Sequence, residues 1–243
     1  MRVLVATMDA RTTRLLLLRH GEVASHRGDV PVTAEGLRHA EDVGRALRPQ
    51  VGERARVLFG GTRRTRETAE AIVRGLGEEA TIDGPFDSFA LRNPDLYLAG
   101  VRVDMVSSPE TLAVQVPEME VDDVRRHGWW MAFFEAPDRI GSWLTHPAPC
   151  GEDAGDVARR VHRFARSLAG HGPTRGATVI GVTHSPVLRS VLSDAAGADP
   201  GEPAYVTGVE VRIDAAGEVS VTPFDALAPT DHPRADHPRA DHR

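Results

Sequence analysis

Continuous apolar runs along the chain predict the strands of a buried sheet. Residues 15–18, 57–59 and 179–182 contain no polar side chain. Runs of this kind are typical of strands that are covered on both faces, as in a parallel sheet. Because both faces of such a sheet must be covered by helices, the pattern favours an α/β architecture with three layers.

Apolar residues at helical spacing predict the helices that cover this sheet. The first helix is expected to begin after the N-cap Thr33 and to end at Pro49, which cannot continue it. Its apolar positions are Leu37, Ala40, Gly44 and Leu47. Three more helices are expected over residues 64–75, 152–169 and 186–195.

The remaining segments complete the predicted architecture. Residues 205–213 and 218–224 alternate between apolar and polar, which predicts a C-terminal β-hairpin. Residues 84–148 break the pattern and are expected to form an insertion, or lid, over the carboxyl edge of the sheet, where functional loops often lie. The prediction is a single α/β domain over residues 1–227, a three-layer α/β/α sandwich with a mostly parallel central sheet.

Basic side chains follow each of the three apolar runs. Arg19-His20-Gly21 comes directly after the first run. Arg64 opens the helix after the second run, and His184 stands at the end of the third. Since open α/β sheets bind ligands at the carboxyl ends of their strands, these side chains are expected to meet there. An imidazole beside guanidinium groups suits attack on phosphorus. The imidazole nitrogen is the nucleophile, and each guanidinium group can bind two phosphate oxygens at once.

The order and context of these residues resemble the histidine phosphatase superfamily, the phosphoglycerate-mutase-like proteins. That family has Arg-His-Gly after its first strand, then an arginine four residues before Thr-Ala, then a strand that ends in histidine. Arg64 stands at that distance from Thr68-Ala69. Residues 31–36 and 150–153 match further family segments, so the resemblance extends from about residue 14 to residue 192.

The resemblance implies a phosphoryl-transfer site. A phosphomonoester carries close to two negative charges and repels anionic nucleophiles, so the neutral imidazole of His20 is expected to attack and to form a phosphohistidine. Arg19 and Arg64 are expected to bind the non-bridging phosphate oxygens, and His184 to donate a further hydrogen bond to them. Positioned donors of this kind matter because phosphoryl transfer depends mainly on positioning and charge stabilisation.

Three more residues are candidates for substrate binding. Gly21 is expected to let the backbone turn tightly beside His20. Ser185 follows the third strand and is expected to contribute a hydroxyl or backbone contact. Arg92 is the third candidate, within the segment where the family places a carboxylate.

The general acid is the least defined part of the predicted site. The family usually supplies it from a Glu or Asp about 25 residues past the second arginine. At the matching position this chain has an amide, Asn93. Asp95 is the favoured candidate and Asp87 the alternative, and either carboxylic acid needs a raised pKa to act near neutral pH.

Composition narrows the classes of partner. The 243 residues carry a formal net charge of −6, which argues against nucleic acid, and no segment approaches the roughly 20 apolar residues that span a bilayer. The single cysteine, Cys150, and the lack of a secretory pattern favour a cytoplasmic location. No metal or cofactor is expected. Residues 228–243 repeat a proline-containing unit of five residues and are predicted to be a disordered tail.

The sequence therefore predicts a metal-independent phosphatase that hydrolyses a small phosphomonoester through a phosphohistidine on His20. Two alternatives stay open. A phosphoglycerate-mutase-type phosphotransferase needs extra basic residues for a carboxylate substrate and must shield the phosphohistidine from water. A non-catalytic protein that binds a phosphorylated ligand is the other alternative, because the carboxylate of the family is missing at Asn93. None of these motifs specifies the substrate or the oligomeric state.

Overall fold

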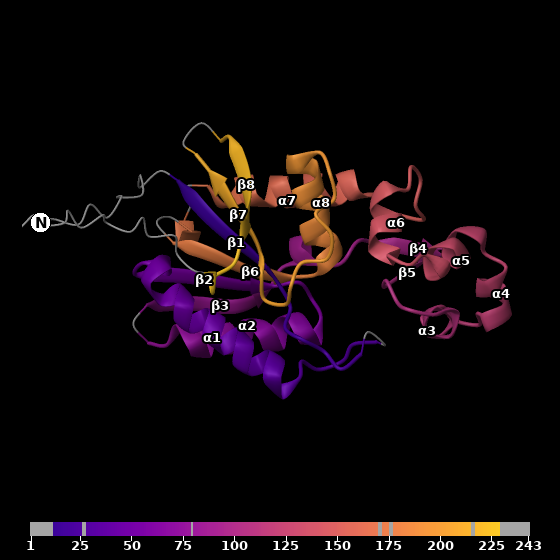
Figure 1. Cartoon of the computed structure of the whole chain (residues 1–243), viewed down its shortest axis with the longest axis horizontal. Helices are drawn as coiled ribbons and strands as arrows, with labels where there is room; N and C mark the ends of the chain where they lie inside the picture. The colour runs from indigo at the N-terminus through magenta and orange to yellow at the C-terminus, as the bar shows by residue number, and fades with distance from the viewer. Residues whose placement is uncertain are drawn as a thin grey trace, which may run out of the picture.

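The computed structural model describes residues 12–25, 28–78, 80–169, 172–174, 177–214 and 217–228. Of the predicted tail, residues 228–243, all but residue 228 lie outside these residues. The described part of the chain forms an α/β sandwich around one twisted sheet, with a group of short helices to one side of that sheet (Figure 1).

Six strands of the described chain form the central sheet, in the order β3-β2-β6-β1-β7-β8. They are β1 (Thr13–Arg19), β2 (Arg54–Phe59), β3 (Thr81–Asp87), β6 (Thr178–Thr183), β7 (Gly208–Ile213) and β8 (Val219–Phe224). The pairs β3–β2, β2–β6 and β6–β1 are parallel, whereas β7 pairs antiparallel with both β1 and β8. The mostly parallel sheet and the C-terminal hairpin are as predicted.

The four leucines of β1 divide between two hydrophobic cores, because successive side chains of a strand point to opposite faces. Leu16 and Leu18 pack with α1 (Ala34–Val51) and α2 (Arg63–Leu76). Leu15 and Leu17 pack with α7 (Ala154–Leu168) and α8 (Ser185–Ala196) on the other face. This division makes the three layers, and it explains why β1 reads as a continuous apolar run.

The insertion joins the second of these cores. It consists of a 3₁₀ turn, a short hairpin and four short helices: η1 (Phe89–Leu91), β4 (Leu96–Leu98), β5 (Val101–Val103), α3 (Pro109–Ala113), α4 (Val121–Arg125), α5 (Gly128–Glu135) and α6 (Arg139–Thr145). Trp130 and Trp143 are fully buried and belong to the same cluster as Val187 of α8. The insertion is therefore fixed to the sheet domain by a shared apolar core.

Several predicted boundaries differ from the structure; the first strand of the hairpin, for example, begins at Gly208 and not at residue 205. Residues 84–87 belong to β3, which pairs with β2 at the edge of the sheet, so the insertion begins after Asp87. Thr33 is the N-cap of α1, as predicted, and accepts a hydrogen bond from Gly36 N. The helix does not end at Pro49, however, but continues to Val51. Val51 is 2% exposed in the core, and its burial offsets the backbone hydrogen bond that proline cannot make.

Close contact between α1 and α2 gives a test of this packing. A Cβ added to Gly75 would overlap the carbonyl oxygen of Glu41 and lie 2.8 Å from Gly44 Cα. Gly75→Ala is expected to lower the free energy of unfolding by about 1–3 kcal/mol, because the two helices must separate. Urea denaturation measures the change.

The matched control is Gly128→Ala at the start of α5. A Cβ at that position meets no atom of the described chain within 4 Å, so stability should change by no more than about 0.5 kcal/mol. Equal stabilities for the Gly75→Ala variant and the wild type would contradict the close helix contact.

Candidate active site

The parallel pairing of β1 with β6 brings the two histidines together. Arg19 pairs with Thr183 in the register of these strands, so His20 and His184 leave the sheet side by side. Their ring centroids are 5.6 Å apart, and the residues His20 and His184 are 4% and 2% exposed, respectively. Gly60, at the end of β2, completes this edge, and its backbone N–H donates to Val182 O at 3.0 Å.

The backbone around His20 fixes which ring nitrogen carries the proton. His20 Nδ1 lies 2.8 Å from Gly21 O, and a carbonyl oxygen only accepts, so Nδ1 is the protonated nitrogen. In the neutral ring the lone pair is then on Nε2, the atom a nucleophile needs. Gly21 N donates to Thr68 Oγ1 at 2.8 Å, and Thr68 Oγ1 donates to Arg64 O at 2.7 Å. A Cβ on Gly21 would lie 2.9 Å from Val32 Cγ1, so the turn has little room for a larger residue.

His184 is held as a neutral ring that orients Arg64. Arg64 Nη2 lies 3.3 Å from His184 Nδ1 and must donate to it, because guanidinium groups do not accept hydrogen bonds. His184 Nε2 is then the donor and faces Gly60 O at 3.4 Å. Complete burial, reinforced by the charge of Arg64, holds the pKa of His184 well below its ordinary value of 6.5. A hydrogen bond from His184 to phosphate stays a prediction, since its N–H faces Gly60 O in this structure.

The two predicted arginines carry their charge beside these rings. Arg64 is largely buried, and this burial lowers its pKa while Asp29 and Asp104 oppose the effect. Arg19 lies over the Tyr205 ring, with 4.2 Å between the guanidinium carbon and the ring centroid. The Nε atoms of Arg19 and Arg64 have no hydrogen-bond partner in the described part of the chain. Two guanidinium groups with unused donors beside a neutral imidazole form a ready site for a doubly charged anion.

These side chains line a cavity of about 260 Å³. Its wall includes Arg19, His20, Arg64, Asn93, Asp138, Arg139, His184, Ser185 and Glu202. A second cavity, of about 460 Å³, shares Arg64, Met105 and Val106 with it. The smaller cavity suits a phosphoryl group, and the larger one offers room for the rest of a small ester.

Ser185 and Asn93 take part in the cavity, each in a different way. Ser185 Oγ donates to the carboxylate of Glu202 at 2.5 Å. Asn93 is 6% exposed, and its Oδ1 has no hydrogen-bond partner among the described residues. Asn93 thus lines the cavity and carries a buried, unpaired acceptor, at the position where the family resemblance implies a carboxylate.

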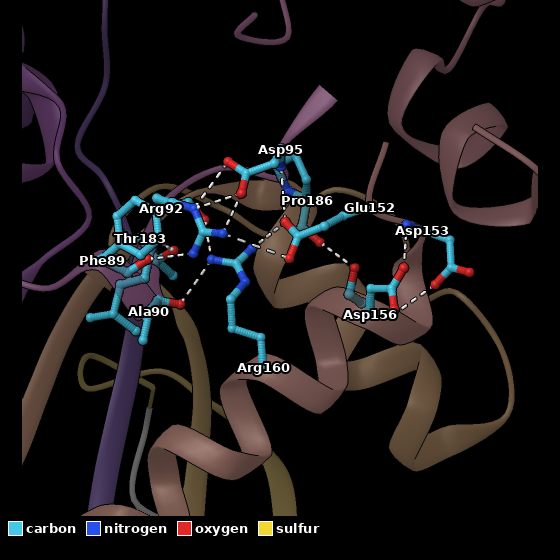
Figure 2. Close-up of polar contacts among 12 residues, drawn as sticks. Phe89, Ala90, Arg92, Asp95, Glu152, Asp153, Asp156, Arg160, Thr183 and Pro186 are labelled. Carbon is cyan, nitrogen blue, oxygen red and sulfur yellow. Dashed lines mark hydrogen bonds and ion pairs between the residues drawn. The ribbon is translucent and has the colours of Figure 1, made fainter. Parts of the chain in front are cut away.

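Asp95 and Arg92 lie outside the lining of this cavity. Figure 2 shows that they belong to a network between the 89–95 segment and the start of α7. Arg92 donates to both carboxylate oxygens of Asp95 and to Phe89 O, and Arg102 donates to Asp95 at 2.5 Å. Burial opposes ionisation of Asp95, but Arg92 and Arg102 outweigh it and hold the pKa of Asp95 at about 2.

Glu152 and Arg160 extend the same network (Figure 2). Glu152 accepts from Asp95 N at 2.9 Å and from Arg160 at 3.1 Å. Arg160 also donates to Ala90 O and Arg92 O. The network therefore fixes the segment that carries Asn93, and an ionised, doubly paired Asp95 is poorly suited to release a proton near neutral pH.

Sequence reasoning missed several residues of the site. Thr68, which holds the Gly21 turn, stands in the Thr-Ala motif, so its place was visible although its role was not. Tyr205 and Glu202 contact Arg19 from the segment before β7, where no motif marks them. In the part of the chain that the structure describes, no three His, Cys, Asp or Glu side chains form a group that could hold a metal ion. None of the helices described has the length and apolarity that crossing a bilayer requires.

Comparisons with known proteins agree with this geometry. The sequence profile of the histidine phosphatase superfamily (branch 1) matches residues 15–89 and 117–213, which is more than half of the chain. The chain therefore belongs to the histidine phosphatase superfamily. No curated protein sequence shows significant similarity to it.

Solved structures share the fold at low sequence identity. A mycobacterial glucosyl-3-phosphoglycerate phosphatase is 16% identical with a TM-score of 0.54, covering 88% of this chain and 99% of its own. Phosphoglycerate mutase from Bacillus anthracis is 14% identical with a TM-score of 0.58, covering 89% and 94%. A putative alpha-ribazole-5'-P phosphatase from Escherichia coli is 16% identical with a TM-score of 0.54, covering 88% and 96%. Phosphatases and a mutase thus share this architecture.

The depressed pKa of His184 predicts how stability depends on pH. Below about pH 6.5, His184 binds a proton in the unfolded chain but not in the folded chain. The free energy of unfolding is therefore highest above that pH and decreases as pH falls toward the folded pKa of His184. Relative to His184→Gln, the wild type should lose up to about 1.4 kcal/mol of unfolding free energy per pH unit in that range. Urea denaturation at pH 7.5, 6 and 5 tests this, and a difference that does not vary with pH would contradict it.

The pKa of Asp95 predicts a structural role for this carboxylate. Because its pKa falls from 3.8 to about 2, ionisation contributes about 2 kcal/mol above pH 4, and this contribution is lost as pH falls through 2. Asp95→Asn should therefore lower the free energy of unfolding at pH 7 by about that amount. The control is Asp122→Asn, whose side chain is 74% exposed, with an expected change within about 0.5 kcal/mol. A stable Asp95→Asn variant without turnover would instead assign Asp95 to the chemistry.

Proposed function

We propose that this protein is a phosphatase that hydrolyses a small phosphomonoester through a phosphohistidine on His20. The observation that supports it best is the hydrogen bond from His20 Nδ1 to Gly21 O, which leaves the lone pair on Nε2 in a cavity lined by two guanidinium groups. Nε2 attacks phosphorus and the bond to the leaving oxygen breaks. Water then attacks the phosphohistidine, breaks the P–N bond and releases inorganic phosphate.

The charges of the cavity suit the anion that this reaction handles. Arg19 and Arg64 would each offer paired donors to the phosphate oxygens, and their charge persists at every physiological pH. Transfer of a phosphoryl group gains mostly from such positioned cations. Because His184 is neutral, it accepts from Arg64 and keeps that guanidinium directed into the cavity.

The larger cavity favours hydrolysis over the mutase alternative. A phosphoglycerate carries a carboxylate that needs a cation apart from those on the phosphate. The described residues that line this cavity include Asp29, Asp104 and Gln115, and no cation besides Arg64. These features favour an uncharged, hydroxylated leaving group.

Phosphate release from a panel of phosphomonoesters in the presence of EDTA tests the proposal. The wild type should release phosphate and His20→Ala should not. Acid-labile, base-stable labelling of the protein by a ³²P-labelled substrate should also require His20. Interconversion of 2- and 3-phosphoglycerate without phosphate release would support the mutase, and phosphate binding without any turnover would support the non-catalytic alternative. Activity abolished by EDTA would refute the metal-independent mechanism.

Substitution of Arg64 tests the role of the guanidinium groups. Arg64→Gln should lower kcat/KM by about 10²–10³-fold, by analogy with the loss of one positioned donor to a developing anion. The matched control is Arg66→Gln on the same helix, whose side chain is 55% exposed and whose kcat/KM should stay within about twofold. Equal effects of the two substitutions would contradict the assignment of Arg64.

A further inference from the structure

The leaving oxygen of a phosphomonoester needs a proton, and few groups at the cavity are suited to supply it. Among the described residues, two carboxylates line the cavity, Asp138 and Glu202. Asp138 receives two hydrogen bonds from Arg189, at 3.0 and 2.6 Å, and one from Gly141 N. The hydrogen bonds from Arg189 outweigh burial and hold the pKa of Asp138 at about 2. Asp138 therefore stays ionised, and Glu202 is the other carboxylate in the lining of this smaller cavity.

Glu202 contacts the same groups that the proposed function assigns to the phosphate. Its Oε1 lies 2.7 Å from Arg19 Nη2, and its Oε2 accepts from Ser185 Oγ. Arg189 Nη1 also lies 3.5 Å from Oε2. A phosphate that binds Arg19 must therefore meet the Glu202 carboxylate on the same guanidinium.

The backbone around Glu202 is anchored although its side chain is 47% exposed. Arg19 Nη1 donates to Pro203 O at 2.6 Å, Arg19 N donates to Thr207 O at 2.8 Å, and Val206 N donates to Arg19 O at 3.2 Å. Three hydrogen bonds thus hold residues 203–207 against Arg19 at the end of β1. These three hydrogen bonds reach backbone atoms of the segment, so they do not depend on the position of the Glu202 carboxyl group.

Two anions on one guanidinium favour uptake of a proton. A like charge close by disfavours the ionised form of a carboxyl group, and a strongly coupled pair titrates as a unit. When a phosphate dianion reaches Arg19, a proton shared with the neighbouring Glu202 carboxylate would relieve the repulsion between the two anions. Binding of the ester would thereby bring an acidic proton to the cavity.

We infer that Glu202 is the proton-transfer residue of this site, a role that rests on the proposed phosphatase function. In the first step His20 Nε2 forms the bond to phosphorus. The bond from phosphorus to the ester oxygen breaks, and that oxygen takes the bonding electrons and the proton of Glu202 to leave as an alcohol. In the second step the Glu202 carboxylate takes a proton from the attacking water. The P–N bond then breaks toward His20, and the products are inorganic phosphate and the starting enzyme.

The test compares two probes that differ in how much their leaving group needs a proton. The p-nitrophenolate of p-nitrophenyl phosphate leaves readily as an anion, whereas the alkoxide of glycerol phosphate does not. Glu202→Gln should lower kcat for glycerol phosphate by about 10²–10⁴-fold and kcat for p-nitrophenyl phosphate by less than about tenfold. Glu202→Asp keeps a carboxyl group and should recover part of the lost kcat for glycerol phosphate.

The matched control is Glu70→Gln on the exposed side of α2, which should leave both kcat values unchanged. If Glu202→Gln lowers KM for both probes at unchanged kcat, Glu202 only competes with phosphate for Arg19 and the inference is wrong. Equal losses of kcat for both probes would assign it a positioning role and also overturn the inference. A wild-type protein that hydrolyses neither these probes nor any ester of the panel would overturn the proposed function, and the role of Glu202 with it.

Discussion

Parallel pairing of β1 with β6 is the constraint on which the site depends. The register pairs Arg19 with Thr183, so the next residues, His20 and His184, lie side by side. The backbone pairing alone is enough to bring them together. Both strands are held by apolar side chains that are fully buried in two separate cores: the four leucines of β1, and Val179, Ile180 and Val182 of β6. The geometry of the candidate site is thus secured by the apolar layers, which leaves the residue types at the strand ends open to selection for function.

The site concentrates positive charge on Arg19 and Arg64, and few carboxylates among the described residues pair with them, which costs folding free energy. The Nε atoms of Arg19 and Arg64 have no hydrogen-bond partner among the described residues. The lowered pKa of His184 keeps its ring neutral, so it adds no further positive charge to the site. In the structure Glu202 partly balances Arg19. A phosphate dianion would neutralise the remaining positive charge. The same buried guanidinium groups that cost free energy without an anion would therefore favour phosphate binding.

The sequence was most informative where local pattern and global fold agree. Apolar runs identified the three parallel strands at the centre of the sheet, and the placement of ligands at strand ends predicted that His20 and His184 converge. β3 was missed because it is an edge strand, half-covered and without an apolar run. The helix end at Pro49 was wrong because tertiary burial of Val51 overrides a local signal.

The limits of sequence reasoning were sharpest for the proton donor. Asp95 stood near the expected spacing, but no local pattern shows that Arg92 and Arg102 pair with its carboxylate or that it lies outside the cavity wall. Glu202 reaches the site only because the segment before β7 folds back onto Arg19, a long-range contact without a motif. Residues that serve through such contacts need coordinates to be found.

The most direct test of the account is a crystal structure of the protein with orthovanadate, a mimic of phosphate in transfer. The account predicts vanadium bonded to His20 Nε2, with vanadate oxygens within hydrogen-bond distance of the guanidinium groups of Arg19 and Arg64. Vanadate bound elsewhere, without contact to His20 and with Arg64 turned out to solvent, would contradict it.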